Sequence, residues 1–87
     1  MDTEADSEPK VWRKRENTLG DGSSFFEEYR VEVREDTVVW GEENYYGMGG
    51  YSELPFAEFR LSERAHGWIR DHFDEAIFQE ILANIPR

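Results

Sequence analysis

The chain has 87 residues, with 20 aspartates and glutamates against 10 lysines and arginines, and a formal net charge of −10. This length allows one domain, and this charge predicts that DNA, RNA and anionic membranes are repelled while basic surfaces are attracted. The absence of cysteine excludes disulfides, thiolate catalysis and cysteine-ligated zinc.

Charge and aromatic residues divide the chain into a tail and a body. Residues 1–9 are acidic and lack large apolar side chains other than Met1, so they are expected to form a disordered tail. Thirteen aromatic residues predict that residues 10–87 fold as a single α+β domain. No apolar run approaches about 18 residues and the N-terminus is not basic, which predicts a cytoplasmic protein without a membrane span or signal peptide.

A basic island, Lys10–Arg15, opens the body with four of the ten bases. An edge strand from Lys10 to Glu16 fits it, because lysine and arginine on an edge discourage unwanted strand pairing. The island either pairs internally with the acidic sheet and tail, or binds phosphate or an acidic partner. Four charges are few for nucleic-acid affinity on so acidic a molecule, which favours internal pairing.

Three strands are expected after a glycine-rich turn at residues 17–24. From Phe25, apolar side chains alternate with charged ones, which is the pattern of a half-buried strand. Glu35 and Asp36 can turn the chain, and Thr37–Trp40 returns as a second strand. A third is predicted over Leu54–Leu61, with Pro55 at its entrance.

The segment Glu42–Tyr51 has three glycines in four positions and is predicted to be a mobile loop. It nevertheless carries large side chains: Tyr45, Tyr46, Met48 and Tyr51. Tyrosine gives a large contact area at low entropic cost, so these residues either anchor a partner or fold back to enlarge a thin core.

A helical pattern runs from Glu63 to Ile85, with Ser62 as N-cap and Pro86 as terminator. Its apolar residues change sides near Asp74. Either the helix breaks there and Asp74 caps a second segment, or a straight helix shows an apolar face to a partner. The predicted fold is therefore α+β, a small antiparallel sheet of three to four strands covered by a C-terminal helix, with a break near Asp74 as the favoured alternative.

No constellation of residues predicts catalysis, a cofactor or a metal. His66 and His72 are six residues apart, and a helical zinc pair needs a spacing of about three or four. Adjacent carboxylates point to opposite faces of a strand, and the glycines near Met48 lack phosphate-loop spacing. We expect a protein that is not an enzyme.

The leading hypothesis is a small acidic protein-binding module, an inhibitor or regulator that covers a basic surface of a partner. That partner could be a nucleic-acid-binding protein, as for the DNA-mimicking phage inhibitors of the anti-CRISPR or anti-restriction type. Direct binding of nucleic acid or membrane is not expected. The residues expected to contact the partner are Glu27, Glu28, Glu32, Glu42, Glu43, Tyr45, Tyr46 and Tyr51.

The alternative hypothesis is a small structural domain that forms a homodimer while its acidic residues keep it soluble. The apolar side of the C-terminal helix would then make the contact. The residues expected there are Ile77, Phe78, Ile81 and Leu82.

Overall fold

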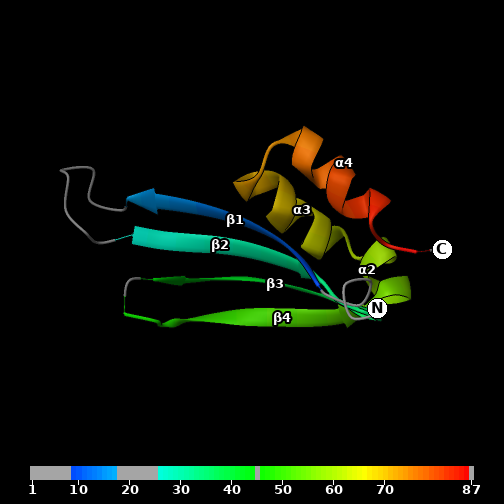
Figure 1. Cartoon of the computed structure of the whole chain (residues 1–87), viewed down its shortest axis with the longest axis horizontal. Coiled ribbons are helices and arrows are strands. Elements are labelled where there is room, and N and C mark those ends of the chain that lie inside the picture. The colour runs from blue at the N-terminus through cyan, green and yellow to red at the C-terminus, as the bar shows by residue number, and fades with distance from the viewer. Residues whose placement is uncertain (1–8, 18–25, 45, 87) are drawn as a thin grey trace, which may run out of the picture.

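The structure is a computed structural model that describes residues 9–17, 26–44 and 46–86. In these ranges four strands form one antiparallel sheet in the order β1-β2-β3-β4, and three helices follow (Figure 1), which confirms the α+β prediction. The predicted tail, apart from Pro9, and nearly all of the turn at 17–24 lie outside the described residues. The elements are β1 (Lys10–Asn17), β2 (Phe26–Val33), β3 (Thr37–Asn44), β4 (Gly49–Pro55), α2 (Phe56–Leu61), α3 (Glu63–His72) and α4 (Glu75–Ala83).

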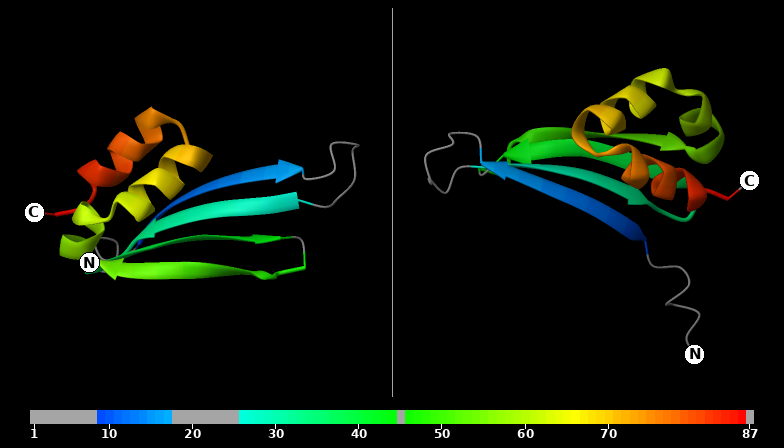
Figure 2. Two further views of the ribbon diagram at one scale, coloured as in Figure 1. Left: turned by 180° about the vertical axis from the view of Figure 1, so that it is seen from behind. Right: turned by 90° about the horizontal axis from the view of Figure 1, so that it is seen from above.

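The predicted alternation decides which face of the sheet is covered. Val31 lies opposite Trp40, and Val33 lies opposite Val38, so the apolar side chains of β2 and β3 share one face. The three helices lie on that face (Figures 1 and 2). Burying apolar area between a sheet and helices is the main stabilising term in such a two-layer fold.

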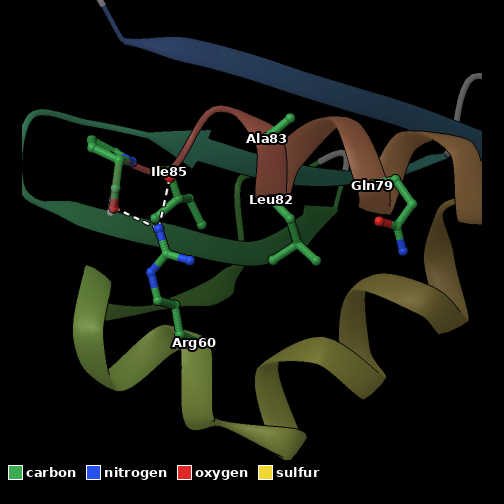
Figure 3. Close-up of a pocket in the computed structure, with 6 residues that line it drawn as sticks. Arg60, Gln79, Leu82, Ala83 and Ile85 are labelled. Carbon is green, nitrogen blue, oxygen red and sulfur yellow. Dashed lines mark hydrogen bonds between the residues drawn. The ribbon is translucent and has the colours of Figure 1, made fainter.

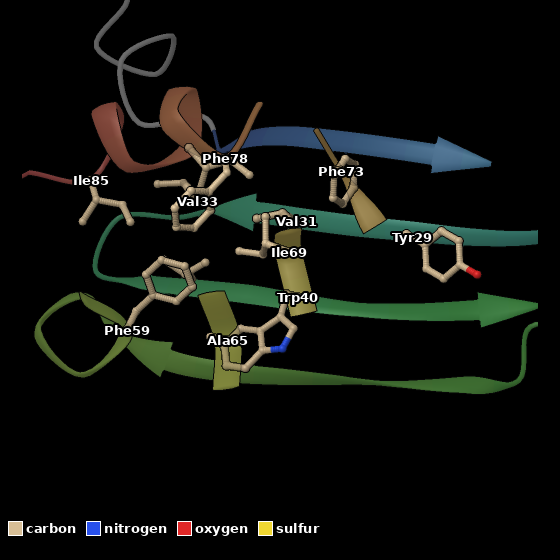
Figure 4. Close-up of a cluster of buried hydrophobic side chains, with 12 residues drawn as sticks. Tyr29, Val31, Val33, Trp40, Phe59, Ala65, Ile69, Phe73, Phe78 and Ile85 are labelled. Atoms are coloured by element: carbon tan, nitrogen blue, oxygen red, sulfur yellow. The ribbon is translucent and has the colours of Figure 1, made fainter. Parts of the chain in front are cut away.

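One core joins the sheet and the helices (Figure 4). Phe59, Phe78 and Ile69 are its largest fully buried side chains, and each comes from a different helix. All three helices are therefore tied to the sheet by burial. The buried apolar residues are Tyr29, Val31, Val33, Val38, Trp40, Phe59, Ala65, Ile69, Phe73, Phe78, Ile81 and Ile85.

The strand predicted over Leu54–Leu61 is wrong for most of its length. β4 ends at Pro55, and Phe56–Leu61 forms the short helix α2. Phe56 and Phe59, three residues apart, share its inner side, whereas Leu61 is 84% exposed. Short apolar runs fit a strand or one helical turn equally well. The packing of Phe56 and Phe59 against the core decided between the two.

Two capping residues predicted from the sequence are confirmed. The Ser62 side chain accepts a hydrogen bond from Ala65 N at 3.1 Å, where α3 begins. The Asp74 side chain accepts one from Ile77 N at 2.9 Å, where α4 begins. The helix therefore breaks near Asp74, and this break turns both apolar sides toward the same sheet.

The predicted mobile loop over Glu42–Tyr51 is largely a β-hairpin. β3 continues to Asn44 and β4 starts at Gly49, so the connection is only four residues long. The Asn44 side chain accepts hydrogen bonds at 2.9 Å from the backbone N–H groups of Tyr46 and Met48. An asparagine that bonds its following backbone stabilises a tight turn. Tyr45 lies outside the described residues.

Close approach of β3 and β4 requires glycine at position 41. A Cβ on Gly41 would overlap the carbonyl oxygen of Gly50 and lie 2.7 Å from Tyr51 Cα. Gly41→Ala is therefore expected to lower the free energy of unfolding by about 1–3 kcal/mol in urea titrations. Gly50→Ala is the control, since its Cβ would meet open space. Equal stability of the two variants would contradict the required approach.

Candidate partner-binding surface

The sheet is longer than the helical layer that covers it. The ends of β3 and β4 that form their hairpin project beyond the helices (Figures 1 and 2). Strand order places this hairpin at one edge of the sheet. Its side chains are consequently outside the core and available to a partner.

Three large side chains are exposed on this hairpin. The exposed fractions are 67% for Tyr46, 67% for Met48 and 42% for Tyr51. Of the two alternatives for the tyrosine segment, packing into the core is therefore excluded for Tyr46 and Tyr51. Together with Glu42 and Glu43 these three residues are named the hairpin surface.

Tyr51 is linked to one of the acidic residues beside it, Glu43. Its hydroxyl donates a hydrogen bond to Glu43 Oε1 at 3.3 Å, and its ring passes over Gly41. Partial burial raises the pKa of the Tyr51 hydroxyl above its ordinary value, and the charge of Glu43 raises it further. Tyr51 is thus neutral at ordinary pH and oriented by a carboxylate.

The predicted acidic residues do not form one cluster, because alternation divides them between the two faces. Strand register places Glu28 opposite Glu43, with Glu32 on the same uncovered face. Glu42 lies opposite Tyr29 on the helix-bearing face, and Glu27 is also on that face. The hairpin surface therefore presents Glu43 on one side and Glu42 on the other.

Two predicted acids are already ion-paired. Glu28 lies 2.9 Å from Arg15 and 3.8 Å from Arg13. Glu32 is only 8% exposed and pairs with Arg34 at 2.9 Å and with Arg30 at 3.4 Å. A cation of the partner would have to replace an arginine that already pairs with the carboxylate, so the net gain in free energy would be small. Glu28 and Glu32 are therefore poor candidates for partner contact.

Three of the four bases of the basic island pair internally with residues of the sheet, as the favoured interpretation predicts. Arg13 and Arg15 hold Glu28 from the neighbouring strand, and Lys14 lies 3.4 Å from Glu16. In contrast, neither Glu42 nor Glu43 has an ion-pair partner within the described ranges. The hairpin surface is therefore a place where carboxylates without an ion pair in the described ranges lie beside exposed aromatic rings.

Tyr29 marks the boundary between the helical layer and the projecting sheet. Its ring stacks on His72 with centroids 4.1 Å apart, and its hydroxyl donates to Glu27 at 3.4 Å. Burial raises the pKa of this hydroxyl above its ordinary value of 10.0, and the charges of Glu27, Glu16 and Glu42 raise it further. Folding therefore favours the neutral hydroxyl of Tyr29.

Tyr29 should consequently make stability depend on alkaline pH. Its stabilising contribution is complete below the ordinary pKa of 10.0 and is lost as pH rises above it. We expect Tyr29→Phe to lose less unfolding free energy than the wild type when urea titrations at about pH 8 and about pH 11 are compared. An equal alkaline loss in Tyr29→Phe would contradict this role.

A separate cleft of about 580 Å³ lies between α2 and the end of the chain (Figure 3). Arg60 reaches across it and donates from Nη2 to the carbonyl oxygens of Ile85, at 2.7 Å, and Pro86. These bonds hold the segment after α4 against α2. The guanidinium therefore has a structural role, and among the described residues that line the cleft no other is charged.

The proposed self-association face is corrected in part. Phe78 is 2% exposed and Ile81 is fully buried, because the break at Asp74 turns them into the core. They cannot form an exposed face in this arrangement. Ile77 and Leu82 are half-buried, and homodimerisation through them stays a prediction.

Within residues 9–17, 26–44 and 46–86, no group of three or more histidine, cysteine, aspartate or glutamate side chains is arranged to hold a metal ion. Across the same ranges, no helix has the length and apolar character needed to cross a membrane. Comparisons with protein-family models, with curated protein sequences and with solved structures found no match for this chain.

Proposed function

We propose that this protein is a small acidic protein-binding module that covers a basic surface of a partner protein. The hairpin surface would make the contact, with Tyr46, Met48 and Tyr51 as anchors and Glu42 and Glu43 as charged groups. It would act as a cytoplasmic inhibitor or regulator without enzymatic activity of its own.

One observation carries this proposal: exposed aromatic and methionine side chains lie beside carboxylates without ion-pair partners in the described part of the chain. Tyrosine is enriched in binding hot spots, and methionine adapts to varied surfaces. A tyrosine ring also attracts lysine or arginine placed over its face. The hairpin surface thus combines apolar contact area with attraction for cations.

The net charge of −10 favours a partner that itself binds nucleic acid. A surface that grips phosphates is rich in lysine and arginine, and rows of carboxylates can occupy it in place of phosphates. This is the strategy of DNA-mimicking phage inhibitors. Long-range attraction would also speed the encounter with such a surface.

The test is the salt dependence of partner binding. The protein is immobilised, partners are captured from its host at about 50 mM salt, and the affinity of the purified partner is then measured as salt rises. We expect the affinity to fall at least about tenfold by about 500 mM salt, because exposed charges become screened. Tight binding that is indifferent to salt would contradict the proposal.

A further inference from the structure

The outer edge of β4 is a second feature of the hairpin that the proposed function does not use. β4 is the last strand in the sheet order, and no described element lies along its outer side (Figures 1 and 2). Six of its seven residues are exposed. An edge strand of this kind presents backbone N–H and C=O groups that can pair with another chain.

The register shows which backbone groups point outward. Asn44 N donates to Met48 O at 2.8 Å, and Phe56 N donates to Asp36 O at 3.2 Å. These two hydrogen-bonded pairs, 44 with 48 and 36 with 56, flank the two ends of β4. Pair types alternate along an antiparallel ladder. Residues 50, 52 and 54 therefore bond to β3, and the N–H and C=O groups of residues 49, 51 and 53 point away from the sheet.

The two edges of the sheet differ in how they are protected. β1, the opposite edge, has four lysines and arginines among its eight residues. Charged residues of this kind are a common defence against strand pairing. β4 has one charged residue, Glu53, and is otherwise guarded only by Pro55 at its end. The β4 edge is thus the one open to an added strand.

A small cleft lies beside this open edge on the helix-bearing face. Its volume is about 170 Å³, and its walls include Trp40 and Trp68. Glu42 and Arg64 also line it and balance each other in charge, which favours an uncharged side chain. Two further lining residues, Gly50 and Ser52, belong to β4 and are small. A side chain of a strand added to β4 would therefore meet the cleft.

We propose that an extended, basic segment of the partner adds to β4 as a fifth strand. This inference rests on the proposed function and specifies how the partner binds. Lysine or arginine side chains of the segment would face Glu43, Tyr51 and Glu53 on the uncovered face of the sheet. Alternate apolar side chains would enter the cleft between Trp40 and Trp68.

The test uses a capped peptide of about eight alternating lysine and valine residues, the length of a typical strand. Its affinity is measured by calorimetry at about 50 mM salt for the wild type, Glu53→Gln and Glu53→Pro. Both variants lose the charge of residue 53, but only proline loses its outward N–H. We expect Glu53→Pro to bind about tenfold more weakly than Glu53→Gln.

Two modified peptides keep the test valid if Glu53→Pro does not fold. Each carries N-methyl groups on one of the two alternating sets of residues and is measured against the wild type. Strand addition predicts that one peptide loses binding and the other keeps it, because only one edge of the peptide faces β4. Binding of both peptides at unchanged affinity would overturn strand addition.

The remaining outcomes separate this inference from the proposed function. If Glu53→Pro binds as Glu53→Gln does while a Glu42→Gln, Glu43→Gln double variant binds weakly, strand addition is wrong and the proposed function stands. If the wild type does not bind the peptide at low salt, strand addition is wrong, and the proposed function is decided by the salt dependence of the captured partner. A dimer in sedimentation that Glu53→Pro dissociates would assign the edge to a second copy and overturn the inference.

Discussion

Replacing Phe59 by alanine is expected to destabilise the protein by about 3–5 kcal/mol, which is near the upper end of what a single substitution causes. Phe59 is fully buried, and its ring lies 5.9 Å from that of Trp40 and 5.2 Å from that of His66. Removing it leaves a cavity between the sheet and the helices, and the small core has few side chains to fill it. Urea unfolding followed by tryptophan fluorescence measures the loss.

Leu61→Ala is the matched control, because Leu61 is on the same helix and is 84% exposed. Its free energy of unfolding should stay within about 0.5 kcal/mol of the wild type. A domain of this size has a total stability on the order of 5 kcal/mol, so Phe59→Ala would keep only about 0–2 kcal/mol and be marginally folded at room temperature. If both variants lose the same small amount, α2 does not belong to the core.

Reversing the charges of Glu42 and Glu43 to lysine is expected to weaken partner binding at low salt about 100-fold or more. Neither carboxylate is ion-paired in the described part of the protein, and both flank the exposed rings of the hairpin surface. Close charge pairs across interfaces contribute about 1.5 kcal/mol or more each, and reversal replaces attraction by repulsion. The measurement is the affinity for the purified partner as salt rises.

A double reversal at Glu35 and Asp36 gives the control for this prediction. It changes the net charge equally but acts at the opposite end of β3, roughly 20 Å along the strand, which exceeds two Debye lengths at physiological salt. We expect this control to weaken binding only slightly, and mainly at low salt. Equal losses in both double variants would show that net charge, and not the hairpin surface, attracts the partner.

Local sequence patterns were sufficient for much of this fold. The alternation around Val31 predicted β2 and its buried face, because a strand places successive side chains on opposite sides. Ser62 and Asp74 predicted where α3 and α4 begin, because their short oxygens bond the free N–H groups of a first helical turn. Each of these signals depends only on neighbours within a few residues.

The candidate surface was predicted less completely. Tyr46, Tyr51, Glu42 and Glu43 were identified from the sequence and lie together on one hairpin. Met48 stands out in the sequence as a large side chain among glycines but was not predicted to bind the partner, although it is as exposed as Tyr46. The open edge of β4 could not be predicted, since strand order is a property of the whole sheet.

By itself the sequence determined the acidic character of the protein, its α+β class and the β1, β2 and β3 segments in outline, and it favoured a break at Asp74 over a straight helix. Tertiary structure decided that residues 56–61 form the helix α2, that Glu28 and Glu32 are ion-paired with arginines, and that Phe78 is buried. The physical reason is the separation along the chain between the residues that each interaction joins. Periodicity and capping act along the chain, whereas ion pairs, burial and free edges depend on which distant segments the sheet register brings together.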